Sequence, residues 1–169
     1  VFSPMEMSAI LKVIPRPLLA AVAIGAFAGL RTQEIGRLDW SEVRLDRGKI
    51  EVTGPKSKTK KRRLAPISSN LAAWLELVRQ PKGRVANYKN VGNRIGRFAA
   101  GNDITWRRNG MRHSFISYRT ALIENLPKVA LEAGNSPQII QRRYLEVVDK
   151  PEAPECFNIT PESVGRMKA

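Results

Sequence analysis

The chain has 169 residues, enough for one domain with a sizeable hydrophobic core and too few for a second large domain. Lysine and arginine number 29 against 15 acidic residues, and the net charge of +14 favours a polyanionic partner, nucleic acid first, over a basic surface kept only for solubility. One cysteine and one histidine exclude an internal disulfide and a His-rich metal site, so we expect a reduced, intracellular protein without a metal.

The N-terminal region is predicted to form two helices. Ser3 and Glu6 have the spacing of a capping box, and Pro4 stands at the first position of a helix expected over residues 4–14. The most apolar stretch, residues 18–30, is shorter than the ~20 residues that a membrane span needs. We therefore expect a buried core helix and no membrane contact. The opening residues VFSPMEM resemble a helix start inside a folded region rather than a secretory signal, and we expect the chain to be part of a longer protein.

After residue 31 the hydrophobic pattern changes from helical to alternating and back again. The helical pattern continues to Leu38, which is expected to face inward together with Ile35. Alternation then predicts three antiparallel strands, two within 42–52 and one within 62–67. Five further helices are predicted, over residues 68–78, 90–100, 109–123, 126–134 and 136–148. The predicted fold class is mainly α with a small three-stranded antiparallel β-sheet.

The last of these helices carries a tyrosine on its apolar face. Ile140, Tyr144, Val147 and Val148 have the spacing of an inward-facing stripe. This pattern by itself favours a packing role for Tyr144, with its hydroxyl group satisfied by a partner in the core. The alternative, that Tyr144 reacts, depends on the other residues of the chain.

Two arginines lie at positions where neighbouring residues would orient the guanidinium group to bind an anion. Arg31 follows the apolar helix, and Glu34 lies three residues later, where its carboxylate can orient the guanidinium. Arg112 lies between apolar residues on a predicted helix, and a guanidinium buried there would need an anion. The alternatives are that Arg31 is a simple helix cap and that Arg112 is a surface side chain.

Lys58 and Tyr144 complete a set of four motifs. Lys58 lies at the expected tip of the β-hairpin, eight residues before Pro66, and Lys56 is the alternative within the same basic run. Tyr144 follows Asn135 by nine residues. Each motif alone is a weak signal, but their common order and spacing are specific.

In this order and spacing, the four motifs resemble the catalytic domain of the tyrosine recombinase (phage integrase) family, over nearly the whole chain from Ser3 to Tyr144. The resemblance implies a tyrosine recombinase/integrase catalytic-domain fold and a site-specific DNA strand-transferase that acts without metal, ATP or another cofactor. It implies cleavage through a 3′-phosphotyrosine intermediate. By position in the motifs, it implies a catalytic set of Arg31, Lys58, Asn109, Arg112, Asn135 and Tyr144, supported by Glu34 and His113.

These residue types suit the transfer of a phosphodiester without a metal. Two guanidiniums, from Arg31 and Arg112, can clamp the negative charge that develops on the phosphate oxygens. Lys58 can protonate the leaving 5′-oxygen, and a phenol, whose unperturbed pKa is about 10, needs such cations nearby to become a nucleophile. The covalent link conserves the energy of the broken bond, so no nucleotide cofactor is needed.

The sequence departs from the family pattern at two positions where imidazole is usual. Asn109 and Asn135 can donate hydrogen bonds to a phosphate oxygen but cannot take up a proton at neutral pH. His113 matches the family's second histidine, normally structural, and on a helix it points roughly 100° away from Arg112. Slow catalysis is expected, since the guanidinium clamp and the nucleophile remain. Two alternatives stay open: a DNA-binding pseudo-recombinase without the chemistry and, more remotely, a type IB topoisomerase.

The remaining basic residues are expected to contact double-stranded DNA. Phosphate contacts dominate the affinity of such surfaces, so binding should fall steeply with salt concentration. Solvated charges are the alternative for the two arginines of the last helix. The candidate DNA-binding residues are Lys56, Lys60, Lys61, Arg62, Arg142 and Arg143.

We expect residues 1–150 to form the catalytic domain and residues 151–169 a C-terminal tail. Three alternatives are open for the tail. It is disordered, it docks on this domain or, as the resemblance implies, it docks on a neighbouring protomer of a DNA-bound tetramer. The resemblance also implies a monomer in isolation and an N-terminal core-binding domain in the full-length protein, absent from these residues. It also implies that the protein is localised in the bacterial cytoplasm and associated with the nucleoid.

Overall fold

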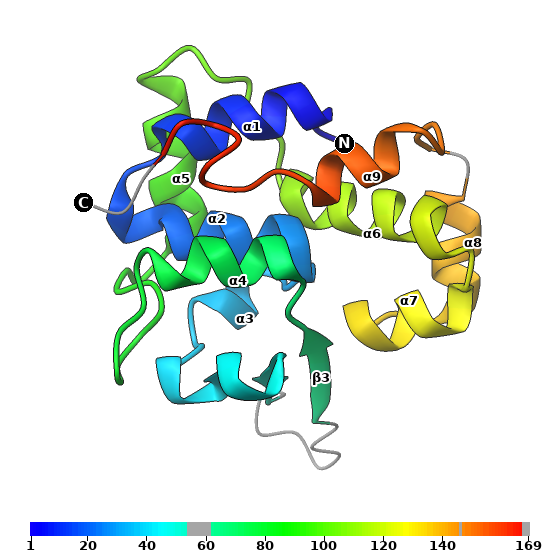
Figure 1. The fold of residues 1–169 in the computed structure, drawn as a ribbon, viewed down its shortest axis with the longest axis horizontal. Helices are drawn as coiled ribbons and strands as arrows, with labels where there is room; N and C mark the ends of the chain where they lie inside the picture. Colours follow the sequence, from blue (N-terminus) through cyan, green and yellow to red (C-terminus); the bar gives the residue numbers. More distant parts are fainter. Residues whose placement is uncertain (54–61, 146, 167–169) are drawn as a thin grey trace.

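The computed structural model of this protein describes residues 1–53, 62–145 and 147–166. They form a helical body with one small antiparallel sheet at its edge (Figure 1). The fold class predicted from the sequence is therefore confirmed. Within these ranges, every helix is too short or too polar to cross a membrane.

The N-terminal helices are α1 (Pro4–Val13) and α2 (Arg16–Ala28), as the sequence predicts. The Ser3 hydroxyl accepts a hydrogen bond from the Glu6 amide at 3.1 Å, and the Glu6 carboxylate accepts one from the Ser3 amide at 2.8 Å. These reciprocal bonds satisfy two amides for which the start of a helix offers no intrahelical partner. In α2 every residue from Leu18 onward is buried, so α2 is a core helix.

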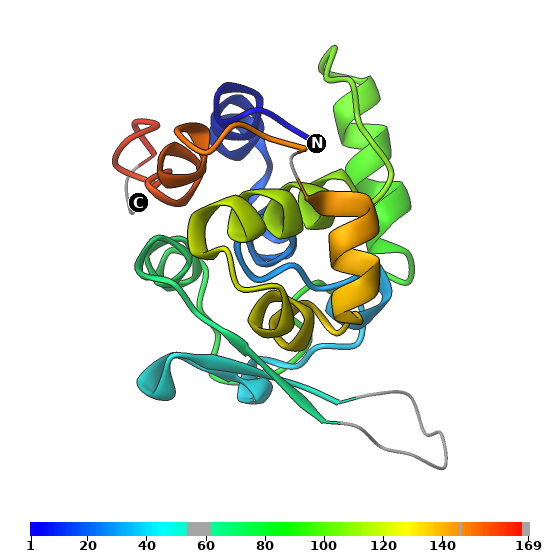
Figure 2. The same ribbon diagram turned by 90° about the vertical axis from the view of Figure 1, so that its right-hand side faces the viewer.

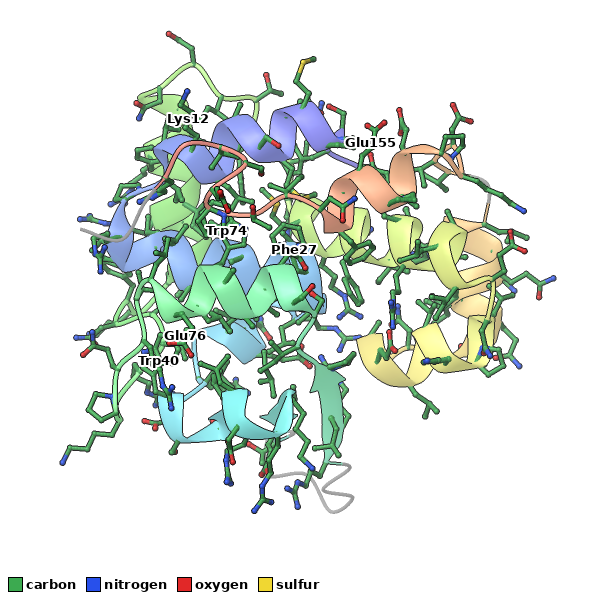
Figure 3. The ribbon with its side chains drawn as sticks, viewed as in Figure 1. Lys12, Phe27, Trp40, Trp74, Glu76 and Glu155 are labelled. Atoms are coloured by element: carbon green, nitrogen blue, oxygen red, sulfur yellow. The ribbon has the colours of Figure 1, made fainter. Side chains whose placement is uncertain are left out.

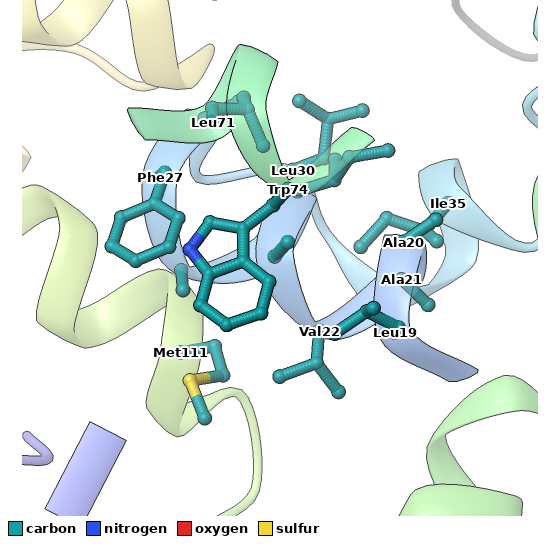
Figure 4. Packing of buried hydrophobic residues seen from close by; sticks show 14 of the residues in the cluster. Leu19, Ala20, Ala21, Val22, Phe27, Leu30, Ile35, Leu71, Trp74 and Met111 are labelled. Atoms are coloured by element: carbon teal, nitrogen blue, oxygen red, sulfur yellow. The ribbon is translucent and has the colours of Figure 1, made fainter. Parts of the chain in front are cut away.

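Helix α2 is the centre of the main hydrophobic core. It packs against α4 (Ser69–Glu76) and α6 (Gly110–Ile123), and Figure 1 shows α4 in front of it and α1 above it. Trp74 is fully buried among these helices, beside Phe27 (Figures 3 and 4). Its indole Nε1 donates a 2.9 Å hydrogen bond to the carbonyl of Ile159, so the C-terminal tail is tied to this core.

Strands β1 (Val43–Arg44), β2 (Lys49–Val52) and β3 (Arg63–Pro66) form an antiparallel sheet in the order β1-β2-β3. Ile50 of β2 pairs in register with Ala65 of β3, and both side chains are fully buried. Alternate residues of each strand thus face the core, which explains the period-two pattern in the sequence. Figure 2 shows β2 and β3 running outward from the helical body. Two 3₁₀ turns flank β1, over Trp40–Glu42 and Leu45–Arg47.

The C-terminal part of the chain builds a second core around α6. Helices α7 (Leu126–Ala133) and α8 (Pro137–Tyr144) pack against each other and against α6. Figure 1 shows them on the side of the molecule opposite α5 (Val91–Ala100). Helix α9 (Glu152–Phe157) follows α8 in the chain. The buried residues of this second core are Phe115, Ile116, Val129, Ala130, Ala133, Ile140 and Tyr144.

Two predictions about helix ends are wrong. The helical pattern after residue 31 does not continue α2, because Gly29 adopts a left-handed φ of 65° and the chain restarts as the short helix α3 (Thr32–Ile35). Helix α8 ends before Leu145, whose backbone is extended, so Val147 is 47% exposed and is not part of an inward stripe. The helical period reflects only residues that are close in the sequence, whereas the positions of these two helix ends depend on tertiary contacts.

Residues 151–166 of the tail pack against this same domain. Ala153 and Cys156 of α9 are fully buried. Nη1 of Arg166 donates a 2.8 Å hydrogen bond to the carbonyl of Leu11 in α1. This part of the tail therefore has its partners within the domain, and docking on a neighbouring protomer stays a prediction.

Candidate active site

The candidate site begins where α2 ends. A Cβ atom on Gly29 would lie 2.2 Å from Cδ1 of Phe115, so a residue without a side chain is required for α2 to approach α6 this closely. The chain then turns into Arg31, the N-cap residue of α3, whose amide donates a 2.7 Å hydrogen bond to Oε2 of Glu34. The break in the helix thus lets Glu34 fix the backbone of Arg31.

The guanidinium of Arg31 connects the end of α2 to the turn between α7 and α8. Nη1 lies 3.3 Å from Oε1 of Glu34, the pairing that the sequence spacing predicts. Nη2 donates to the carbonyl of Gly134 at 2.9 Å and to Oδ1 of Asn135 at 3.2 Å. The side chain is still 45% exposed, so these contacts orient the cation without withdrawing it from solvent.

Sequence reasoning missed one member of this network, Arg63 on β3. Its Nη2 lies 2.7 Å from Oε2 of Glu34, and its Nη1 donates to the carbonyl of Glu132 at 3.4 Å. The Arg63 side chain is 13% exposed. Strand alternation was the available signal, because Arg63 shares the inward face of β3 with Ala65 and an inward arginine requires a carboxylate. Glu34 therefore holds Arg31 and Arg63 together.

Arg112 is buried and incompletely hydrogen-bonded. It is 7% exposed, its Nη1 donates to the carbonyl of Gly29, and its buried Nη2 has no partner among the described residues. Burial and then the positive charge of Arg31 lower the pKa of Arg112 to about 10, against the opposing effect of Glu34. The guanidinium is thus charged at neutral pH. A buried cation with an unpaired N–H favours an anion as its ligand.

Tyr144 has a packed ring and a hydrogen-bonded hydroxyl. The residue is 7% exposed and belongs to the second core. Its Oη lies 2.9 Å from Nδ1 of His113, and the two rings stack with centroids 5.6 Å apart and planes inclined by 25°. The ring carbons of Tyr144 pack in the core, and its hydroxyl oxygen contacts His113. Packing of the ring is therefore compatible with a reactive hydroxyl group, so the sequence alternatives do not exclude each other.

The resemblance implied a structural role for His113, and in the structure its imidazole contacts the hydroxyl of Tyr144. Burial lowers the pKa of His113 below the usual 6.5, and the positive charges of Arg112 and Arg143 lower it further. The imidazole is therefore neutral at pH 7. A neutral imidazole has one ring nitrogen that accepts a hydrogen bond.

The two asparagines occupy different environments. Asn109 is the exposed N-cap residue of α6 and has a left-handed φ of 56°, a conformation that asparagine adopts more readily than most residues. Asn135 is half-buried, and its Oδ1 accepts from Arg31. In the hydrogen-bond network of the described residues, neither asparagine is bonded to Tyr144.

These side chains meet in one groove, which is bordered by α2, α3, α5, α6 and α8. The sequence-predicted residues that line it are Arg31, Asn109, Arg112, His113, Asn135, Arg143 and Tyr144. Four exposed basic residues that sequence reasoning did not single out also line it: Arg37, Lys89, Arg97 and Arg108. The groove is therefore positively charged along its length and not only at the predicted site.

The other predicted DNA-binding residues are spread more widely. Arg142 is exposed on α8, one position before Arg143. Arg62 is exposed and lies 2.6 Å from the carboxylate of Glu51 on the neighbouring strand. Lys56, Lys58, Lys60 and Lys61 lie outside the described residues. Over the ranges that the structure describes, no three His, Cys, Asp or Glu side chains are placed to hold a metal ion.

Comparison with known families decides the class of the domain. Residues 1–125 match the phage integrase family, which covers well over half of the chain. The chain belongs to the phage integrase family. The match includes Arg31, Lys58, Asn109 and Arg112, while Asn135 and Tyr144 lie beyond it. Among curated proteins, no sequence matches the chain.

Two solved structures share the fold of this integrase-family domain. XerA recombinase superimposes with a TM-score of 0.69 at 16% identity, over 86% of this chain and 57% of that one. An integrase from mycobacterium phage Brujita superimposes with a TM-score of 0.60 at 18% identity, over 94% of this chain and 57% of that one. The predicted tyrosine recombinase catalytic-domain fold is confirmed, and the chain spans just over half the length of either structure.

Proposed function

We propose that this chain is the catalytic part of a site-specific DNA recombinase or integrase that cuts and rejoins DNA through a 3′-phosphotyrosine at Tyr144. One observation carries the proposal: the hydrogen-bonded hydroxyl of Tyr144 lines the same groove as two guanidiniums, and one of these has an N–H without an acceptor.

Each residue of the site has a separate role in the proposed reaction. Arg31 and Arg112 bind the non-bridging oxygens of the scissile phosphate and stabilise the charge that grows on them in the transition state. Oη of Tyr144 attacks the phosphorus, and the bond from phosphorus to the 5′-oxygen breaks. Attack by a 5′-hydroxyl from another strand reverses the step and releases the tyrosine. The phosphodiester energy is kept in the covalent link, so neither metal nor ATP enters the reaction.

Lys58 is the proposed acid for the leaving 5′-oxygen, on the sequence motif alone. Lys58→Ala is expected to slow cleavage of ordinary DNA by about 10²–10⁴-fold, because an alkoxide is a poor leaving group. A substrate with sulfur at the 5′-bridging position needs no proton on its leaving group and should restore the rate. Single-turnover cleavage of both substrates measures this. If Lys56→Ala shows the rescue and Lys58→Ala does not, the acid is Lys56.

Double-stranded DNA is the proposed partner of the groove, bound by a monomer that assembles into a tetramer on DNA. Arg97 is exposed on the groove. If it contacts a phosphate, Arg97→Gln should weaken binding to all sequences and reduce the slope of log affinity against log salt concentration by about 1. Arg79→Gln is the matched control, because Arg79 is also exposed, pairs with Glu76 and does not line the groove. Equal slopes for both variants would remove Arg97 from the interface.

A DNA-binding pseudo-recombinase is the second candidate, favoured by Asn109 and Asn135, whose side chains cannot take up a proton at neutral pH. Trapping a covalent adduct distinguishes the two. Because phosphate contacts do not specify sequence, the test uses a pool of nicked duplexes with a randomised centre, in which the short strand bearing the 5′-hydroxyl diffuses away after cleavage. Denaturant-resistant protein–DNA complexes, with the DNA mapped to Tyr144 by peptide mass spectrometry, are expected. Binding of the pool without any adduct would replace the proposed function by the second candidate.

A further inference from the structure

The chain has a single imidazole, and it lies at the nucleophile. Both positions where an imidazole is usual hold asparagine, whose side chain cannot accept a proton at neutral pH. His113 is the only histidine in the sequence, and its Nδ1 lies 2.9 Å from Oη of Tyr144. A general base has to lie within hydrogen-bond reach of the proton that it removes, and His113 meets that condition.

The surrounding structure holds the two rings in this relation. His113 is on α6, one residue from the buried Arg112, and Tyr144 ends α8, with its ring in the second core. The rings stack at a centroid separation of 5.6 Å. Because α6 and α8 pack against each other, the contact is set by two rigid elements.

We propose that Nδ1 of His113 accepts the proton of the Tyr144 hydroxyl as the phenol attacks the phosphate, in place of the imidazoles that this chain lacks at Asn109 and Asn135. The assignment rests on the proposed function. It requires the tautomer with hydrogen on Nε2, so that Nδ1 is the acceptor and the phenol is the donor. A neutral His113 at pH 7 is consistent with the direction of its pKa shift.

The step balances without a further reactant. The bond from Tyr144 Oη to phosphorus forms as the bond from phosphorus to the 5′-oxygen breaks. The phenolic proton moves to Nδ1 of His113 and makes an imidazolium, and the 5′-oxygen takes its proton from the proposed acid, Lys58. In the reverse step the attacking 5′-hydroxyl gives its proton to the neutral amine of Lys58, and the imidazolium returns its proton to the oxygen of Tyr144.

The positive charges around His113 set the pH range of the base. Arg112 on its own helix and Arg143 on α8 disfavour the imidazolium, and Tyr144 is the titratable group in direct contact. The base is therefore competent at neutral pH and is lost as the pH falls through the lowered pKa of His113. The adduct-forming rate of the wild type should show this acidic limb.

The uniqueness of His113 makes the first test direct. In ¹⁵N-labelled protein, long-range ¹H–¹⁵N spectra report the tautomer of the only imidazole without an assignment problem. The expected result at pH 7 is a neutral ring with hydrogen on Nε2, and a shift of the Nδ1 resonance in Tyr144→Phe, where the hydrogen-bond donor is gone. Hydrogen on Nδ1 would overturn the assignment, because Tyr144 would then be the acceptor.

The second test is the rate of adduct formation on the nicked duplexes that trap the wild type. His113→Gln keeps a hydrogen-bond acceptor but not a base, and we expect a loss of about 10²–10⁴-fold, disappearance of the acidic limb and unchanged DNA affinity. Gln141→Ala, exposed on α8, is the control that should keep the wild-type rate. An unchanged rate and pH profile in His113→Gln would overturn this assignment alone. A wild type that forms no adduct would overturn the proposed function and this assignment together.

Discussion

Replacing Tyr144 with phenylalanine is expected to abolish covalent DNA adducts completely and to change the free energy of unfolding by only about 1 kcal/mol, the usual worth of one hydrogen bond. Tyr144 is 7% exposed in the second core, so its ring keeps its packing contacts, and only the hydroxyl bonded to His113 is removed. Denaturing gel analysis of adducts and urea unfolding measure the two effects in the same sample.

Tyr118→Phe is the matched control for this substitution. Tyr118 is also buried, on α6, and its hydroxyl donates a 3.1 Å hydrogen bond to the carbonyl of Phe2. Neither Tyr118 nor Phe2 lines the groove. A similar small loss of stability with adducts retained is expected. Adducts formed by Tyr144→Phe would show that another group is the nucleophile, and Tyr144 would then be a core residue.

Replacing Arg112 with methionine is expected to reduce cleavage by at least about 10²–10³-fold, the effect of removing one preorganised donor to a developing oxyanion. Its unpaired Nη2 is the donor that we assign to a phosphate oxygen. Stability should fall little, because the burial that lowers the pKa of Arg112 to about 10 also disfavours the cation in the folded state. Methionine fills most of the space without a charge. Single-turnover cleavage and thermal unfolding measure the two effects.

Arg119→Met separates this effect from a general loss of charge on α6. Arg119 makes two hydrogen bonds, of 2.9 and 3.0 Å, to the carboxylate of Glu132, so its removal leaves a buried carboxylate without its partner. We expect Arg119→Met to lose more stability than Arg112→Met while retaining adduct formation. Full cleavage by Arg112→Met would remove Arg112 from the phosphate site. Arg31→Ala is expected to resemble Arg112→Met in cleavage, since both guanidiniums act on the same phosphate.

The sequence by itself determined the features that depend on neighbours a few residues apart. The capping box at Ser3 and Glu6 and the buried faces of α2 and of β2 follow from caps and periodicity, which short segments encode fully. The pairing of Arg31 with Glu34 is equally local, three residues along the chain. The order and spacing of the motifs were also sufficient to place the chain in its family, which the match over residues 1–125 confirms.

Only the tertiary structure decided which of the motif residues touch. The contact of His113 with Tyr144 joins residues on two helices, and the contact of Arg63 with Glu34 joins a strand to α3. The periodicity of the sequence predicts neither contact, because the distance between the two groups depends on how α6, α8 and the sheet pack. The same holds for Gly29, where the approach of Phe115 ends a helix that the local pattern would have continued. Local patterns thus identified the charged and nucleophilic groups, and packing brought one imidazole to the hydroxyl that we expect to react.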